Sequence, residues 1–140
     1  MKNVKWILML AAMTTLSMFA CTNNPDDTVD INNLTDVLEA SGDWEVTYYW
    51  DKDKDETSDF ASYTFRFKEN GVFEGTRNGT TQTGTWSVDN SSQKLIINIG
   101  TDKPLTDLID DWIILEKTDR LIKLKDDNDE HLEELHFERI

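Results

Sequence analysis

Apolar and polar residues alternate with a period of two along most of the chain beyond residue 42. The alternating runs cover residues 44–50, 63–67, 72–76, 81–88, 95–99, 112–116, 121–125 and 131–139. Successive side chains of a strand point to opposite faces, so these runs predict half-buried β-strands. Asn70-Gly71 and Asn78-Gly79 separate consecutive runs and predict tight hairpins between antiparallel strands.

The spacing of these runs predicts an all-β fold, an eight-stranded antiparallel up-and-down barrel. Eight strands can close on themselves around a filled interior or one small ligand, and closure removes exposed sheet edges. The pattern changes before residue 42, where Ile31, Leu34, Val37 and Leu38 recur at helical spacing. We therefore expect a short helix over residues 31–40, before the first strand, with Asn32 or Asn33 as a candidate cap.

The first twenty residues are read as a signal peptide, residues 1–20. Lys2 and Lys5 precede an uncharged apolar run, residues 6–20, which is too short to span a membrane comfortably. Residues 16–21, Leu-Ser-Met-Phe-Ala-Cys, resemble a lipobox, and this implies cleavage before Cys21 and acylation of its thiol with fatty acids such as palmitate. The alternative is an ordinary secretory signal with an incidental cysteine.

Cysteine usage agrees with a lipid anchor. Cys21 is the only cysteine, so the chain cannot form an internal disulfide, and lipidation removes a free thiol. Residues 21–30 are polar and predict a flexible tether, which leaves residues 31–140 as one barrel domain. These features predict an outer-membrane lipoprotein of a bacterial cell envelope, facing either the periplasm or the cell surface.

Charge narrows the choice of partners. The chain has 28 acidic and 14 basic residues, a formal net charge of −14, and removal of Lys2 and Lys5 makes it −16. Such a surface repels nucleic acid and anionic headgroups and favours solubility. We therefore expect a monomer that binds no nucleic acid and meets the membrane through its lipid anchor.

Three short motifs, taken in order, resemble the lipocalin-like (calycin) proteins, and above all the small lipocalin-like lipoproteins of Bacteroidota. They are Gly42-Asp43-Trp44, the run from Tyr63 to Gly71, and Gly84-Thr85-Trp86. The resemblance implies that Trp44, with Gly42 before it, closes one end of the barrel and that Arg139 stacks across the indole. The lipocalin Thr-Asp-Tyr motif is missing, and the loop over residues 51–59 is short and charged.

Aromatic residues on the predicted inward faces allow two functions. If the barrel has a pocket, its wall residues are Tyr48, Trp50, Tyr63, Phe65, Phe73 and Trp86. The first hypothesis is a lipid-anchored binding protein that holds a small hydrophobic ligand. The alternative is a filled barrel that acts as an interaction module, an inhibitor or accessory subunit that binds a protein or a glycan. Gly75 and Gly84 either leave space inside the barrel or let the strands bend.

The sequence contains no catalytic or cofactor signature, and we predict neither enzyme activity nor a cofactor. No nucleophile elbow, phosphate loop or dinucleotide fingerprint is present. Carboxylates at alternate positions of residues 51–59 resemble a calcium loop, but Glu56 and Ser62 replace its glycine and its bidentate glutamate. That loop and the acidic turn over residues 126–130 are interpreted as solvated. His131 and His136 fall on opposite strand faces, so no metal site is predicted.

Overall fold

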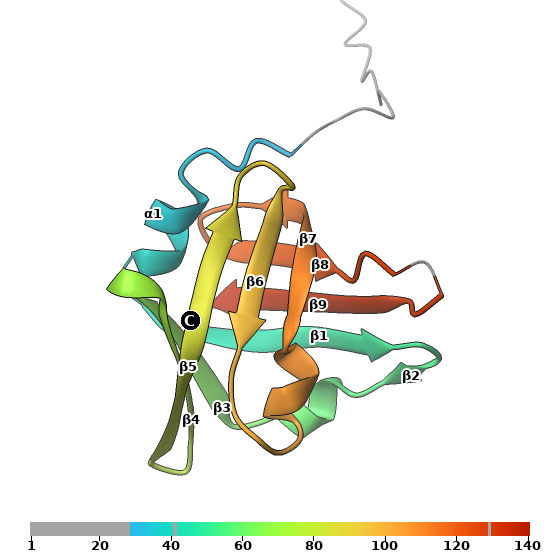
Figure 1. Cartoon of the computed structure of the whole chain (residues 1–140). Helices are drawn as coiled ribbons and strands as arrows, with labels where there is room; N and C mark the ends of the chain where they lie inside the picture. The colour runs from blue at the N-terminus through green and yellow to red at the C-terminus, as the bar shows by residue number, and fades with distance from the viewer. Residues whose placement is uncertain (1–28, 41, 129) are drawn as a thin grey trace, which may run out of the picture.

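The chain folds into one closed antiparallel barrel with a short helix at one end (Figure 1). The computed structural model describes residues 29–40, 42–128 and 130–140. The predicted signal peptide, Cys21 and most of the predicted tether therefore lie outside the described residues. Over the remainder, the predicted fold class of an eight-stranded antiparallel barrel preceded by one short helix is confirmed.

Each barrel strand pairs with its neighbour in sequence, and the last pairs with the first. The elements are α1 (Leu34–Glu39), β1 (Trp44–Asp51), β2 (Lys54–Asp55), the 3-10 helix η1 (Thr57–Phe60), β3 (Tyr63–Lys68), the 3-10 turn η2 (Glu69–Gly71), β4 (Val72–Arg77), β5 (Thr80–Asp89), β6 (Lys94–Asn98), the 3-10 helix η3 (Leu105–Leu108), β7 (Asp110–Lys117), β8 (Leu121–Lys125) and β9 (Glu133–Arg139). The order runs β1-β3-β4-β5-β6-β7-β8-β9, and β9 returns to β1. The two-residue β2 adds only a hairpin to the end of β1.

Both predicted Asn-Gly turns are present in the structure. Asn70 and Gly71 have φ angles of 64° and 73°, and Asn78 and Gly79 have 51° and 77°. Two successive left-handed residues make the primed turns whose twist matches antiparallel strands. The helix is shorter than predicted, and Asn33 occupies its N-cap position without a side-chain hydrogen bond.

A β-bulge in β1 reverses which residues of this strand face the interior. Val46 pairs with Phe137 and Tyr48 pairs with His136, so Thr47 is an extra residue without a partner. An extra residue shifts the alternation by one position. The prediction that Tyr48 and Trp50 face inward is therefore wrong. Tyr49 takes the interior position with 1 % exposure, while Tyr48 and Trp50 stay half-exposed on the outside.

Stacked aromatic rings fill the interior along β3, β4 and β9. Phe65 and Phe73 lie nearly parallel with ring centroids 5.6 Å apart, and Phe67 and Phe73 lie 4.6 Å apart. Phe137 meets Phe65 and Phe67 edge-on, at 5.6 Å from each. All four rings are at most 2 % exposed. Aromatic pairs prefer these offset and edge-to-face arrangements, so this region forms a packed core.

The two interior glycines have different roles. A Cβ atom on Gly75 would lie 3.2 Å from Phe65 and 3.3 Å from Ile99, so neighbouring side chains already occupy its space. A Cβ atom on Gly84 would lie 2.0 Å from the carbonyl oxygen of Asn98. Gly84 therefore permits a close backbone approach between β5 and the end of β6. Neither glycine leaves an open cavity beside it.

Helix α1 covers one end of the barrel, where three residues of the predicted structural motif meet. The Arg139 guanidinium carbon lies 4.6 Å from the ring centroid of Trp44, which is fully buried. Arg139 also donates a hydrogen bond to the carbonyl oxygen of Val37 in α1. A Cβ atom on Gly42 would lie 3.3 Å from the stem of Arg139. The arginine thus joins the helix to the barrel end that Trp44 closes.

The other end of the barrel, which we call the mouth, is covered by η1 and η3 (Figure 1). Phe60 of η1 packs edge-on against Tyr49 at 5.2 Å. The Tyr49 hydroxyl donates a hydrogen bond of 3.3 Å to the carbonyl oxygen of Asp107 in η3. Phe60, Leu105 and Leu108 are buried to 2 % exposure or less. Apolar side chains therefore cover the route by which a ligand would reach the interior.

Candidate functional site

An apolar groove lies on the outer face of the barrel, where β1, β8 and β9 reach the mouth. Its volume is about 280 Å³, and it is lined by Tyr48, Trp50, Leu115, Lys125, Asp126, Asn128, His131, Leu132, Glu133 and Glu134. Leu132 is 68 % exposed and Leu115 is 40 % exposed. We call this feature the outer groove. Large apolar side chains gathered around one hollow distinguish it from isolated surface leucines.

The bulge in β1 places Tyr48 and Trp50 in the outer groove. They are two residues apart and project from the same face of the strand. The Trp50 indole Nε1 donates a hydrogen bond of 3.0 Å to the Lys52 carbonyl oxygen. The Tyr48 ring lies over the His136 ring at 4.8 Å, and His136 bonds Glu134 at 2.6 Å. Both aromatic rings are therefore held in place without a ligand.

The rim of the outer groove is mainly acidic. Asp126, Glu133 and Glu134 supply carboxylates, and Lys125 supplies a positive charge. An apolar centre within a polar rim is the usual anatomy of a protein-binding surface, in which tryptophan and tyrosine carry much of the binding energy. An acidic rim favours partners that carry basic groups.

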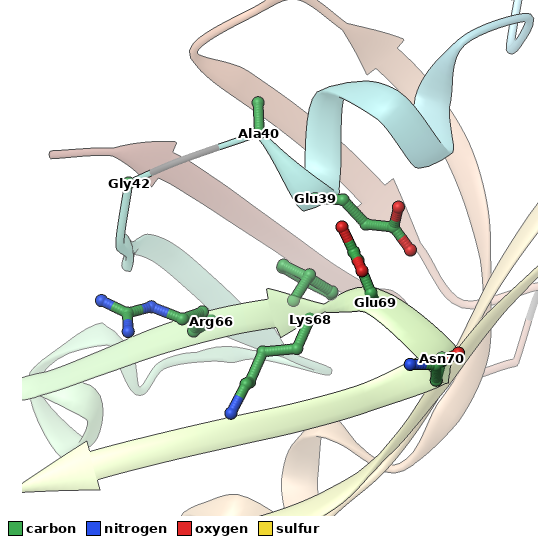
Figure 2. A pocket seen from close by; sticks show the side chains of 8 residues that line it. Glu39, Ala40, Gly42, Arg66, Lys68, Glu69 and Asn70 are labelled. Atoms are coloured by element: carbon green, nitrogen blue, oxygen red, sulfur yellow. The ribbon is translucent and has the colours of Figure 1, made fainter.

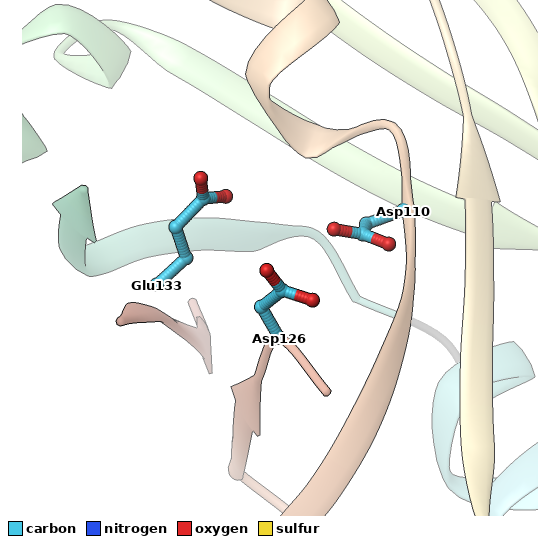
Figure 3. Close-up of side chains that lie close together, drawn as sticks. All are labelled: Asp110, Asp126 and Glu133. Atoms are coloured by element: carbon cyan, nitrogen blue, oxygen red, sulfur yellow. The ribbon is translucent and has the colours of Figure 1, made fainter. Parts of the chain in front are cut away.

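Three carboxylates converge in the mouth beside the outer groove. Asp110 of β7, Asp126 just after β8 and Glu133 of β9 each offer an oxygen, and these oxygens lie within 4.8 Å of one another (Figure 3). Asp51 of β1 is the register partner of Glu133. The Asp51 Oδ1 atom is buried and has no hydrogen-bond partner among the described residues. We call Asp51, Asp110, Asp126 and Glu133 the mouth carboxylates.

Burial and the charges of acidic neighbours change the acidity of two of the mouth carboxylates, Glu133 and Asp110. Burial, followed by the charges of Asp51, Asp126 and Asp110, raises the pKa of Glu133 to about 7. Burial likewise raises the pKa of Asp110. In contrast, Lys94 bonds Asp111 at 2.6 Å and lowers the pKa of that neighbouring carboxyl. The inward carboxylates thus differ from the exposed ones because no described basic side chain is paired with them.

A second hollow lies beside the end of α1 and is larger but more polar. Its volume is about 600 Å³, and it is lined by Glu39, Ala40, Gly42, Arg66, Phe67, Lys68, Glu69 and Asn70 (Figure 2). Arg66 is bound to Asp43, and Lys68 is bound to Glu74 at 3.0 Å. Acidic neighbours therefore engage both basic groups of the hollow, and its other charged residues are Glu39 and Glu69, whose side chains lie side by side (Figure 2).

The six proposed wall residues do not form one pocket. Phe65, Phe73 and Trp86 are buried in the core, and the Trp86 indole donates a hydrogen bond of 3.0 Å to the Lys68 carbonyl oxygen. Tyr63 lies near the mouth, stacked on Phe65 at 5.8 Å. Tyr48 and Trp50 lie outside, in the outer groove. The structure therefore brings two of the six together in a hollow, on the opposite side of the barrel wall from the predicted one.

Several residues of the outer groove and mouth escaped the sequence analysis. Leu115 sits at a second bulge, in β7, and Leu132 precedes β9. Asp51 and Asp126 were assigned to solvated loops, yet each projects toward the mouth. Asp126 follows an alternating run and continues its inward face, a signal that the sequence does contain. Asp51 reaches the inward face only because the bulge at Thr47 shifts the alternation of β1.

The architecture defines a class: a closed, eight-stranded, up-and-down barrel with a filled interior and covered ends. A solved structure of a DUF4847 family protein from Bacteroides vulgatus ATCC 8482 superposes on this chain with a TM-score of 0.53 at 16 % identity. The match covers 75 % of this chain and 96 % of the other. At this identity the likeness establishes a shared fold.

No protein-family model matches the chain, and no curated protein matches its sequence. Within the part of the chain that the structure describes, no helix is both long and apolar enough to cross a membrane. Function must therefore be argued from the site itself.

Proposed function

We propose that this protein is a lipid-anchored module of the bacterial envelope that binds a protein partner through the outer groove. Cys21 would carry the anchor, and the barrel would serve as a rigid scaffold for the groove. The observation that carries the proposal is the position of Tyr48 and Trp50, which are fixed on the outer face beside Leu115 and Leu132. Rigid aromatic anchors on strands bind with little loss of side-chain entropy.

A hydrophobic carrier is less well supported by the same geometry. The rings of Phe65, Phe67, Phe73 and Phe137 contact one another inside the barrel, and Phe60, Leu105 and Leu108 cover the mouth. An apolar ligand would have to displace several buried side chains in order to enter. Close-packed interiors resist such insertion.

The rim specifies the chemistry of the partner. An apolar side chain fits the centre of the groove, and lysine or arginine beside it would meet Asp126, Glu133 and Glu134. The groove is small for a whole protein interface, so we expect one inserted anchor surrounded by a wider, flatter contact.

The test is a binding assay of the full chain on arrays of peptides and glycans. Peptides with an aromatic or aliphatic residue flanked by lysine or arginine should bind, and acid-flanked peptides should not. Trp50→Ala and Leu132→Ala should each weaken binding by about tenfold or more, as expected for anchor residues. Ile96→Ala is the matched control, because Ile96 is 39 % exposed and does not line the groove.

Three results would contradict the proposal. One is binding of glycans alone, and another is equal loss of binding in the Ile96 control. The third is an apolar molecule that copurifies with the chain and is lost on Phe73→Ala while the Trp50 variant retains it. That last result would restore the hydrophobic carrier.

A further inference from the structure

The outer groove and the mouth carboxylates share two residues. Asp126 and Glu133 line the groove, and they also belong to the carboxylate cluster at the barrel end. A partner that occupies the groove therefore approaches groups whose charges depend on one another. Because the two features share residues, the charge on the mouth carboxylates can influence binding in the outer groove.

The surroundings of Glu133 are almost entirely acidic. Tyr49 and Asp51 face it from β1, Asp126 from the end of β8 and Asp110 from β7. Lys52, just beyond β1, opposes these groups and lowers the pKa of Glu133. On the rim stand Lys125, His131 and Glu134, with Glu134 bonded to His136. Lys103 pairs with Asp107 of η3 at 3.0 Å, and the charge of Asp51 also acts on this lysine.

Carboxylates this close cannot all be ionised without cost. Removing them partly from water penalises each charge, and every ionised neighbour adds repulsion. A proton held among them relieves both effects, and so does a cationic group that arrives from outside. The raised pKa of Glu133, about 7, agrees with proton retention near neutrality.

We infer that binding in the outer groove is linked to protonation of the mouth carboxylates, so that acidification releases a basic partner. The inference rests on the proposed function and adds regulation to it. At high pH the ionised cluster attracts lysine or arginine of the partner. At low pH a bound proton reduces the negative charge of the cluster, so the attraction weakens and the partner dissociates.

The first experiment needs no partner. Carbon-13 NMR of the side-chain carboxyls in the full chain should show Glu133 titrating near pH 7, with a coupled shift at Asp110. Glu133→Gln should remove this step. A Glu133 midpoint near that of an ordinary glutamate would overturn the inference, whatever the binding assays give. Loss of the step on adding millimolar calcium would overturn it too, and would identify a cation site.

The second experiment uses the basic peptide selected on the array. If the peptide binds only when Glu133 is ionised, its affinity at pH 5.5 should be about 30-fold lower than at pH 8.5. The reason is that a carboxyl with a pKa of about 7 is ionised in only a few per cent of molecules at pH 5.5. Glu133→Gln should bind weakly at both pH values. Glu138→Gln is the matched control, because Glu138 is exposed on β9 and does not line the groove, and it should leave both the affinity and its pH dependence unchanged. His131→Gln and His136→Gln should retain the pH dependence. If a histidine variant, and not Glu133→Gln, loses the pH dependence of the affinity, the inference is overturned. If the peptide does not bind at any pH, the proposed function itself is refuted.

Discussion

At the scale of single residues, the position of a carboxylate within its strand decides its chemistry. Asp110 and Asp111 are neighbours, yet Asp110 faces the mouth while Asp111 bonds Lys94 on the outside. Burial raises the pKa of the first, and the lysine lowers the pKa of the second. Strand alternation therefore gives two adjacent, identical side chains opposite shifts.

Glu133 provides a stability prediction at this scale. Its pKa is raised from 4.5 to about 7 in the fold, so the folded state binds a proton more tightly than the unfolded state. Its contribution to stability is fully present below pH 4.5 and is lost as the pH rises through about 7. Glu133→Gln should therefore raise the free energy of unfolding at pH 8 by about 1 kcal/mol, a value reduced for solvent screening.

Urea unfolding of both proteins from pH 4 to pH 8 would measure this difference. The free energy of unfolding of Glu133→Gln should exceed that of the wild type by an amount that grows as the pH rises. Glu138→Gln, at an exposed position of the same strand, is the matched control. A constant gap across the range would mean that Glu133 has an ordinary pKa.

At the scale of elements, bulges and turns govern which side chains meet. One extra residue in β1, Thr47, moves Tyr49 into the core and leaves Tyr48 and Trp50 outside. The 3-10 helices η1 and η3 then place Phe60, Leu105 and Leu108 over the mouth. The outer groove and the filled interior are thus two consequences of local irregularities in a regular meander.

Neighbouring tyrosines of β1 test the bulge directly. Tyr49→Ala should reduce the free energy of unfolding by about 3–4 kcal/mol, because it removes a buried ring. Tyr48→Ala should cost no more than about 1 kcal/mol, because its ring lies on the outside. Chemical denaturation measures both values. The opposite order would show that β1 follows an uninterrupted alternation.

At the scale of the whole molecule, the barrel is a closed scaffold with its two ends covered differently. Trp44 and Arg139 lie beneath α1 at one end, and the mouth carboxylates lie beside η1 and η3 at the other. The outer groove opens near the mouth, whereas the chain enters the barrel at the end that α1 covers (Figure 1). A chain tethered before α1 would therefore carry the groove at the end away from its tether.

Membrane attachment is the prediction at this scale. Wild-type protein expressed in a bacterial host that processes lipoproteins should fractionate with the membrane, and its mass should include acyl chains on Cys21. Cys21→Ser should release the protein into the soluble fraction without changing the circular dichroism of the barrel. Membrane retention of the Cys21 variant would refute the lipid anchor.

The sequence by itself determined the strands, the turns and the order of the barrel. Period-two alternation and the Asn-Gly pairs act locally, and neighbouring strands joined by tight turns have few alternative pairings. The resemblance to lipocalin-like proteins also implied the meeting of Gly42, Trp44 and Arg139, which the structure shows in contact. Local chemistry was sufficient for the strands and the turns, whereas the contact between Trp44 and Arg139 followed from the family resemblance alone.

Only the tertiary structure decided where the candidate site lies. A bulge is specified by pairing with another strand, so Tyr48 and Tyr49 cannot be assigned to opposite faces from β1 alone. Pairing of β7, β8 and β9 brings Asp110, Asp126 and Glu133 together, and closure of β9 on β1 adds Asp51. Barrel closure is a property of the whole sheet, and for that physical reason the groove and its acidic cluster were absent from the sequence pattern.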